Sequence, residues 1–218
     1  MNYKPLSKEF LLARGKCCKN SCAFCPYKNK NMELKSVMRD EIGVKGLNDL
    51  CQDINEYFGD KEDLVIVEIG SYMGESTEIF AKNFPNAEIW AIDPWEGGYD
   101  ENDSCSEANY TEVEQQFDLR TSQYKNIKKH KGFSTTTEIK YDVLYLDGNH
   151  SFEGVKADIL HWTPLRNEKA IISGHDYCVD EEFLKIHKHI EGVKRAVDTF
   201  LLPPQKTYCD NSWMIKIN

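Results

Sequence analysis

The chain has 218 residues, 40% of them hydrophobic, so it can bury one sizeable core and carry a small additional segment. It contains no run of about 18 apolar residues, which argues against a membrane-spanning helix and against a membrane partner. The first residues, MNYKPLSKEFLLARGK, lack the apolar segment and the cleavage site of a secretory signal, so we expect a cytoplasmic protein.

The charge of the chain, −9 in total, is distributed unevenly. Residues 1–40 hold nine Lys or Arg and three Asp or Glu, a net charge of +6, whereas the other residues hold 18 and 33, a net charge of −15. Binding to nucleic acid requires a positive field around the phosphates. The main part of the chain is therefore not expected to bind nucleic acid, and the amino-terminal arm alone carries the charge to do so.

The predicted elements begin after a basic, cysteine-rich segment, residues 1–39, which shows only weak periodicity. From residue 40, apolar side chains recur at helical spacing until Gly59, which predicts a helix that this glycine ends. Strand patterns and helical patterns then alternate, as in parallel sheets whose strands are joined by helices. We expect strands over residues 63–70, 87–93, 126–134, 141–148 and 169–177, and helices over residues 75–84, 111–124, 151–165 and 191–202.

The predicted fold class is α/β, a Rossmann-like, doubly wound sheet of about seven strands, most of them parallel. The stretches KTYCD and SWMIKIN, on either side of Asn211, predict an antiparallel carboxyl-terminal edge. We expect two parts, a small cysteine-rich module over residues 1–39 and a main domain over residues 40–218. The polar loop over residues 96–110 is long enough to act as a lid.

Small or polar side chains follow the apolar strands, at the edge of an open parallel sheet where ligands bind. A carboxylate after the second strand is placed to accept hydrogen bonds from the hydroxyls of a ribose. The two glycines after the first strand fit a ligand-binding turn and an ordinary tight turn equally well. The residues at these strand ends are Glu68, Gly70, Ser71 and Gly74, then Asp93, then Ser134, then Asp147 and His150, and finally His175 and Asp176.

The segments VEIGSYMGEST, IDPWEGG, DVLYLDGNHSFEGVKADI and IISGHDY resemble the class I S-adenosylmethionine-dependent methyltransferases. The nearest group contains macrocin-type sugar O-methyltransferases and relatives from cephalosporin biosynthesis, and the resemblance runs from about residue 40 to the carboxyl terminus. It implies S-adenosylmethionine as the cofactor and a small-molecule acceptor, such as a sugar or another hydroxylated metabolite. The implied cofactor contacts are Glu68, Gly70, Ser71 and Gly74 at the methionine end, Asp93 at the ribose, Ser134 near the adenine, and Asp147.

Trp95, two residues after this ribose position, is open to two interpretations: it forms a wall of the cofactor pocket or of the substrate entrance, or it packs inside the fold.

The resemblance also implies a divalent ion, because relatives that use Mg²⁺ bind it at the positions of Asp147, His175 and Asp176. Imidazole suits Mn²⁺, Fe²⁺ or Zn²⁺ better than Mg²⁺. Either the ion differs, or His175 acts as a base, or His175 orients Asp176 without binding an ion. An ion would lower the pKa of an acceptor hydroxyl, and His150 could accept its proton. Asp147, His150 and His175 are therefore the candidate catalytic residues, although Asp147 could instead cap the next helix.

Four cysteines, Cys17, Cys18, Cys22 and Cys25, cluster in ARGKCCKNSCAFCPYKNK. One interpretation is a radical-enzyme iron–sulfur cluster, which would require a preceding strand and a following barrel that the sequence does not predict. A second is a structural Zn²⁺ or Fe–S site, and a third is free or disulfide-bonded thiols. We predict the metal-stapled module, because so short a basic segment cannot bury a core of its own. The pattern CCxxxCxxCPY also resembles a small uncharacterised family that brings no known activity.

Two functions follow from these observations. The first is a methyltransferase that acts on a small molecule, with metal assistance. The alternative is a catalytically altered binding protein of the same fold, whose basic arm docks nucleic acid or a carrier protein. A relative with altered chemistry is a third possibility, since one branch of the resembling family is tied to hydroxylation. A homodimer is the expected assembly for such enzymes.

Overall fold

The structure is a computed structural model that describes residues 34, 39–98 and 104–218. Contacts within the chain divide it after Ser36, and the description below concerns the unit from Val37 to Asn218. The four clustered cysteines lie outside the described residues, so the zinc or iron–sulfur site stays a prediction. Within the described ranges, no helix combines the length and the apolar character that crossing a membrane requires.

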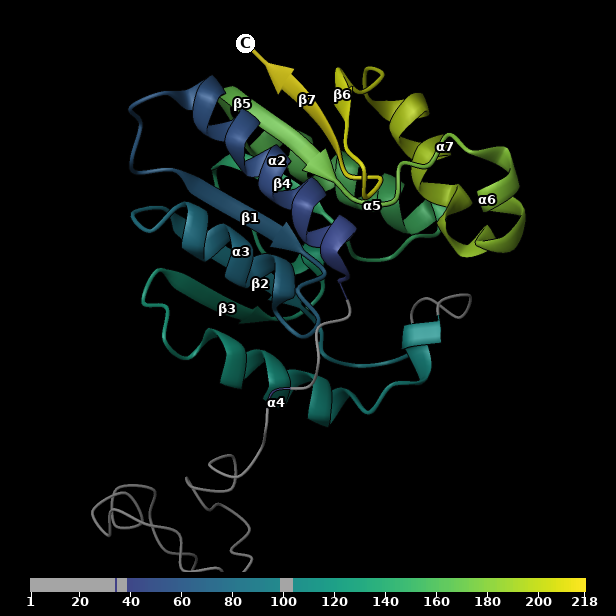
Figure 1. The fold of residues 1–218 in the computed structure, drawn as a ribbon, viewed down its shortest axis with the longest axis horizontal. Coiled ribbons are helices and arrows are strands. Elements are labelled where there is room, and N and C mark those ends of the chain that lie inside the picture. The colour runs from purple at the N-terminus through teal and green to yellow at the C-terminus, as the bar shows by residue number, and fades with distance from the viewer. Residues whose placement is uncertain (1–33, 35–38, 99–103) are drawn as a thin grey trace, which may run out of the picture. The chain divides into compact units, whose positions relative to one another are not determined.

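A seven-stranded sheet forms the centre of the unit, with the strand order β3-β2-β1-β4-β5-β7-β6 (Figure 1). The first five strands in the chain are parallel, whereas β7 runs antiparallel to both β5 and β6. The predicted fold class and the antiparallel edge are therefore confirmed. The strands are β1 (Val65–Ile69), β2 (Glu88–Asp93), β3 (Ile127–Lys131), β4 (Tyr141–Leu146), β5 (Arg166–Gly174), β6 (Lys206–Thr207) and β7 (Trp213–Ile217).

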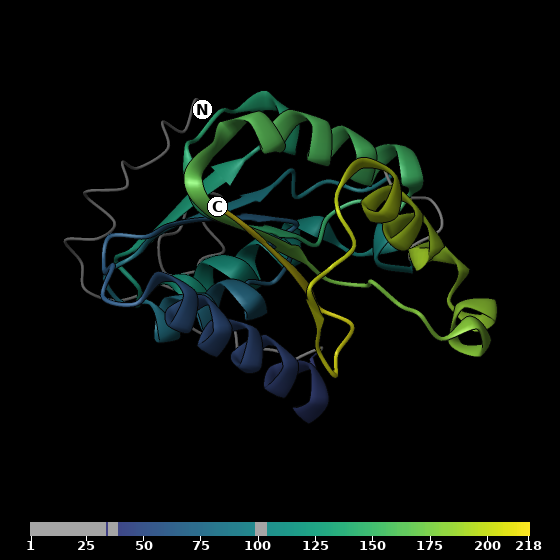
Figure 2. The same cartoon turned by 90° about the horizontal axis from the view of Figure 1, so that it is seen from above.

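Helices cover both faces of the sheet, as the turned view shows (Figure 2). One face carries α2 (Glu41–Phe58), α3 (Glu75–Asn83) and α4 (Tyr110–Thr121), and the other carries α5 (Phe152–Trp162) and α7 (Glu191–Phe200). Helix α2 begins where Asp40 accepts a hydrogen bond from the Gly43 N–H, and it ends at Gly59 as predicted. A short helix that the sequence did not indicate, α6 (Glu181–Ile186), precedes α7.

The hydrophobic core lies in two layers, one on each side of the sheet, and β4 contributes to both. All six residues of this strand are buried, because alternate side chains point to opposite faces. Val143 and Tyr145 pack with α2 and α3, while Leu144 and Leu146 pack with α5 and α7. The strand therefore has no solvent-exposed face, and Asp147 follows directly after it.

The chain reverses its direction of travel across the sheet between β1 and β4, which lie side by side at the centre. In open α/β sheets, the crevice for a ligand lies at this switch point, outside the carboxyl ends of the strands. Short 3₁₀ turns, η2 (Ser104–Glu107), η3 (Ser134–Thr136), η4 (Thr163–Leu165) and η5 (Lys188–Ile190), connect the main elements. The fold thus places the ends of β1, β2, β4 and β5 around one site.

Candidate active site

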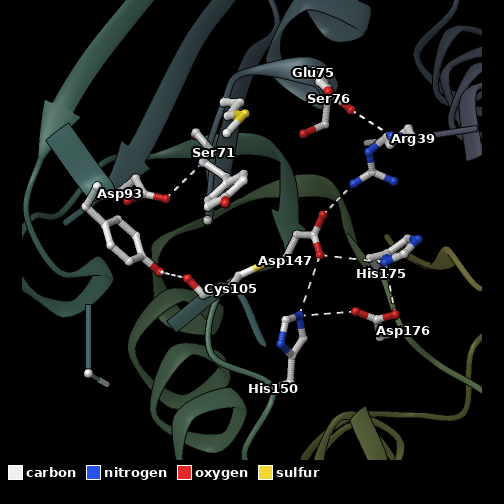
Figure 3. A pocket seen from close by; sticks show the side chains of 16 residues that line it. Arg39, Ser71, Glu75, Ser76, Asp93, Cys105, Asp147, His150, His175 and Asp176 are labelled. Carbon is white, nitrogen blue, oxygen red and sulfur yellow. Dashed lines mark hydrogen bonds and ion pairs between the residues drawn. The ribbon is translucent and has the colours of Figure 1, made fainter. Parts of the chain in front are cut away.

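Two neighbouring cavities, of about 280 and 210 Å³, lie at the carboxyl ends of the central strands. Gly70 and Gly148 line both cavities, so together they form one elongated site. The sequence-predicted residues that line the first cavity are Gly70, Ser71, Asp93, Asp147, His150, His175 and Asp176 (Figure 3). Ser134 lines the second cavity.

The turn after β1 requires glycine at position 70. Gly70 has a φ of 86°, and a Cβ atom there would lie 2.0 Å from the carbonyl oxygen of Asp147. The backbones that follow β1 and β4 therefore touch at the centre of the site. Because no side chain projects from Gly70, the cavities above the two strand ends stay open to a ligand.

Glu68 and Gly74 lie behind this turn and do not line either cavity. The Glu68 carboxyl group is fully buried, where its Oε2 accepts hydrogen bonds from the hydroxyls of Ser71 and Thr77. Its Oε1 has no hydrogen-bond partner among the described residues. Burial raises the pKa of Glu68, and hydrogen bonds from neighbouring hydroxyls offset part of that rise.

Asp93, at the end of β2, is buried at the wall of the first cavity. Its Oδ2 accepts the Tyr72 N–H at 2.9 Å and its Oδ1 accepts the Trp95 N–H at 2.6 Å. Burial raises the pKa of Asp93, and the two backbone N–H groups offset part of the rise. The Trp95 ring packs against Phe117, with 4.8 Å between ring centroids, and does not line the cavities. Of the two interpretations of Trp95, the structure therefore favours packing.

Four side chains from the ends of β4 and β5 gather at one end of the first cavity (Figure 3). His175 Nδ1 lies 3.1 Å from Asp176 Oδ1 and 3.7 Å from Asp147 Oδ1. His150 Nε2 lies 3.1 Å from Asp176 Oδ2 and 3.9 Å from Asp147 Oδ1. The two imidazoles thus alternate with the two carboxylates. Asp176 takes a φ of 61°, a strained conformation of the kind that persists at functional sites.

The charges of this cluster stabilise one another. Burial opposes ionisation of Asp147, but His175, His150 and Arg39 outweigh it and hold the pKa of Asp147 below its usual value. Burial also opposes ionisation of Asp176, but the two histidines outweigh this effect and hold the pKa of Asp176 well below its usual range. For His175, burial favours the neutral form, but the two carboxylates dominate and raise its pKa. The cluster therefore favours the ionised form of both carboxylates and raises the proton affinity of His175.

Two charged residues in this cluster escaped the sequence analysis, Arg39 and Asp210. Arg39 Nη2 lies 2.5 Å from Asp147 Oδ2, although the predicted domain boundary assigned Arg39 to the cysteine-rich module. Asp210 Oδ2 lies 4.0 Å from Arg39 Nη1 and 3.9 Å from His175 Nε2. Arg39 precedes the periodic pattern of α2 and Asp210 lies in a turn, so neither carried a local signal.

Asp158, from α5, is a third residue that the sequence analysis missed, and it lines the second cavity beside Ser134. Its Oδ1 accepts a hydrogen bond from the Ser134 hydroxyl. Burial raises the pKa of Asp158 to about 6, against smaller opposing effects of Ser134 and His161. The second cavity therefore presents a buried carboxyl group to a ligand.

The residues present fit a divalent ion. Asp147, His175 and Asp176 each offer one ligand atom, and these atoms all lie within 4.8 Å of one another. Two carboxylates and one imidazole suit Mn²⁺, Fe²⁺ or Zn²⁺ better than Mg²⁺. The ion itself stays a prediction, as does its identity.

A profile of the methyltransferase domain family matches residues 67–177, which is more than half of the chain. The chain belongs to this methyltransferase domain family. The predicted enzyme class, a class I methyltransferase that uses S-adenosylmethionine, is thereby confirmed. A second profile, of a family of unknown function, matches residues 2–31, the segment that contains the four clustered cysteines.

Solved structures show the same fold at low sequence identity. The O-methyltransferase NovP has a TM-score of 0.61 and 16% identity, with 81% of each chain covered. An O-methyltransferase from Bacillus cereus in complex with S-adenosylhomocysteine (SAH) has a TM-score of 0.56 and 12% identity, with 87% of each chain covered. The N-methyltransferase NodS from Bradyrhizobium japonicum has a TM-score of 0.52 and 12% identity, over 82% of this chain and 99% of that chain. None of the curated proteins compared with the chain matches it.

Proposed function

We propose that this methyltransferase transfers a methyl group to a hydroxyl oxygen of a small polar acceptor, such as a sugar or another hydroxylated metabolite, with the assistance of a divalent ion. The observation that carries the proposal is the cluster of Asp147, His150, His175 and Asp176 at one end of the first cavity. Methylation of an oxygen requires removal of a proton, and this cluster offers both a proton acceptor and carboxylates that hold the resulting charge.

The elongated site suits a cofactor with a polar amino-acid end and a planar base. The turn at Gly70 and Ser71 and the start of α3 would hold the methionine end, beside the buried carboxyl group of Glu68. Asp93 would accept hydrogen bonds from the ribose, because each of its oxygens retains a lone pair. The adenine would occupy the second cavity, where Asp158 can accept a hydrogen bond from an amino group.

S-adenosylmethionine, when bound, supplies the sulfonium methyl group that the acceptor oxygen takes. We assign the removal of the acceptor proton to the His150 imidazole, which lies beside both Asp176 and Asp147. The two carboxylates stabilise the imidazolium that forms. His175 is assigned a different task, because it is one of the three candidate ligands of the divalent ion.

Asp147, His175 and Asp176 would hold the divalent ion, as their ligand atoms lie within 4.8 Å of one another. The ion would act as a Lewis acid that lowers the pKa of the acceptor hydroxyl. The chain's own contribution is to present the two carboxylates together, just beyond the ends of the neighbouring strands β4 and β5.

Calorimetric titration with SAH, with and without Mn²⁺, tests the cofactor site. We expect the wild-type protein to bind SAH and Asp93→Ala to bind it about tenfold to a hundredfold more weakly, because the ribose loses a buried acceptor. Glu88→Ala, at the opposite end of the same strand, is the matched control and should bind SAH like the wild type. Absence of SAH binding to the folded wild-type protein at millimolar concentration would refute the proposal.

A further inference from the structure

Arg39 reaches the cavity from the segment before α2, outside the part of the chain that the methyltransferase profile matches. Its main chain is fixed by a hydrogen bond from the Arg39 N–H to Glu75 Oε2, at 2.8 Å. Its side chain is 14% exposed and points to Asp147 and Asp210 (Figure 3 shows the first of these contacts). The guanidinium therefore lies inside the candidate site as part of the fold.

The two oxygens of the Asp147 carboxylate have different neighbours. Oδ2 faces the guanidinium at 2.5 Å, while Oδ1 faces His175 Nδ1 at 3.7 Å. Of the two oxygens, Oδ1 is thus the one that faces another candidate ion ligand, His175. An arginine keeps its charge at every pH at which the protein is folded, so this oxygen pair always has one permanent cation beside it.

We propose that Arg39 is the resident cation of the site: it orients Asp147 and keeps the divalent-ion affinity of the Asp147–His175–Asp176 group low. The inference rests on the metal-assisted function proposed above, and it adds that Arg39 sets the affinity of the site for the divalent ion. A second cation must bind against the Arg39 charge, and that repulsion is strong in a buried site, where the effective dielectric constant is lower than in water. The ion is therefore exchangeable and is not a permanent structural part of the protein.

The test compares Mn²⁺ affinities of full-length variants by electron paramagnetic resonance, with and without SAH. Arg39→Met removes the charge and should bind Mn²⁺ about tenfold or more tightly than the wild type. Arg39→Gln keeps a hydrogen-bond donor for Asp147 and should also bind more tightly, which covers the case that the methionine variant does not fold. Arg39→Lys keeps the charge and should stay within about threefold of the wild type.

Two controls separate this charge effect from general changes. Arg166→Met removes an arginine at the start of β5, at the opposite end of the sheet, and should leave Mn²⁺ affinity unchanged. Adding Asp147→Asn to Arg39→Met should abolish the gain, because the ion loses a ligand. After dialysis, elemental analysis should find more Mn²⁺ retained by Arg39→Met than by the wild type.

Equal or weaker Mn²⁺ binding by both neutral variants would overturn the inference, and so would a lysine variant that gains as much as the methionine variant. If the neutral variants bind Mn²⁺ and the wild type does not, the inference holds while the metal assistance of the proposed function fails. If the wild type binds SAH but no variant binds Mn²⁺, the inference fails while the cofactor site stands.

Discussion

Two aspartates lie at opposite ends of β4, and they differ in what surrounds them: Asp142 is buried, whereas Asp147 is partly exposed. Asp142 Oδ1 accepts hydrogen bonds from Lys61 Nζ and Asn167 Nδ2, both at 2.8 Å, and its Oδ2 accepts the Val65 N–H at 2.9 Å. This carboxylate joins three segments of the chain and has its donors in place. Asp142 is therefore a structural residue, although it lies in the same strand pattern as the candidate ligand at the other end.

Asp147, beyond the carboxyl end of the strand, lines the cavity and shares its surroundings with a second carboxylate, Asp176. Its neighbours are one guanidinium and two imidazoles. The imidazoles also lie beside Asp176 and the guanidinium beside Asp210, so no single one of these groups is the partner of Asp147 alone. The difference teaches that an acidic residue at a strand end indicates a site only when like charges and a cavity accompany it. Structural acids instead have donors from several segments.

Substitution of the two aspartates has the largest expected effects and tests most directly whether Asp142 is structural and Asp147 functional. We expect Asp142→Ala to lower the free energy of unfolding by about 3 kcal/mol, because it leaves a buried N–H and an amide without partners. Its SAH affinity should stay within about twofold of the wild type, since the cofactor site is at the other end of the strand. Asp147→Asn should lower Mn²⁺ affinity by about a hundredfold or more.

Urea unfolding and SAH titration check the prediction for Asp142→Ala, and Mn²⁺ titration checks the prediction for Asp147→Asn. If Asp142→Ala instead weakened SAH binding while Asp147→Asn left Mn²⁺ affinity intact, the assignment of structural and functional ends would be reversed.

Asp158 sharpens the comparison, because it is buried like Asp142 but has a single hydroxyl donor, from Ser134, and a pKa raised to about 6. Between an ordinary aspartate pKa of 3.8 and about 6, the folded protein holds a proton that the unfolded chain has released. The free energy of unfolding must therefore fall as the pH rises through this window, by up to about 3 kcal/mol, and must stay lower above it.

Asp158→Asn removes this proton linkage while it keeps an oxygen that can accept from Ser134. We expect the variant to be more stable than the wild type at pH 7.5, by up to about 3 kcal/mol without cofactor, and to match it near pH 3.5. Urea unfolding at several pH values measures the difference. A stability difference that does not change between pH 4 and pH 7 would show that Asp158 is not the buried acid described here.

The sequence could predict the residues that lie at the ends of apolar strands or directly after them. Asp93, Asp147 and His175 were found because the carboxyl ends of parallel strands meet at one edge, whatever the loops between them do. The same argument predicted the order of helices and strands, except for α6, whose residues are not buried and so left no apolar stripe. Trp95 stayed open because the pattern of IDPWEGG does not determine which way the ring turns after Asp93.

Arg39 and Asp210 could not be predicted, because both reach the site through contacts that are distant in the sequence. Arg39 contacts Asp147, 108 positions away, and precedes the helical pattern of α2. Asp210 lies in the turn between β6, which has only two residues, and β7. Its place depends on how the carboxyl-terminal turn packs against α2, and local patterns do not encode such a contact.

Substitution of Gly46 in α2 has the smallest expected effect on stability, and it tests how the carboxyl-terminal turn packs against this helix. A Cβ atom at Gly46 would lie 2.1 Å from Asp210 Oδ1, so the helix and the turn can approach only with glycine there. Asp210 is itself held by Ser212, whose N–H and hydroxyl donate to Oδ1 and Oδ2 at 3.0 and 2.9 Å. An added methyl group must therefore displace the turn that presents Asp210 to Arg39 and His175.

We expect Gly46→Ala to lower the free energy of unfolding by about 2 kcal/mol, although alanine favours helix more than glycine does, because the overlap outweighs the propensity gain of about 1 kcal/mol. Gln52→Ala, on the exposed side of the same helix, should change stability by less than about 0.5 kcal/mol. Urea unfolding distinguishes the two variants. If Gly46→Ala were as stable as the wild type, Asp210 would not need this close approach, and its anchoring of Arg39 and His175 would lose its structural basis.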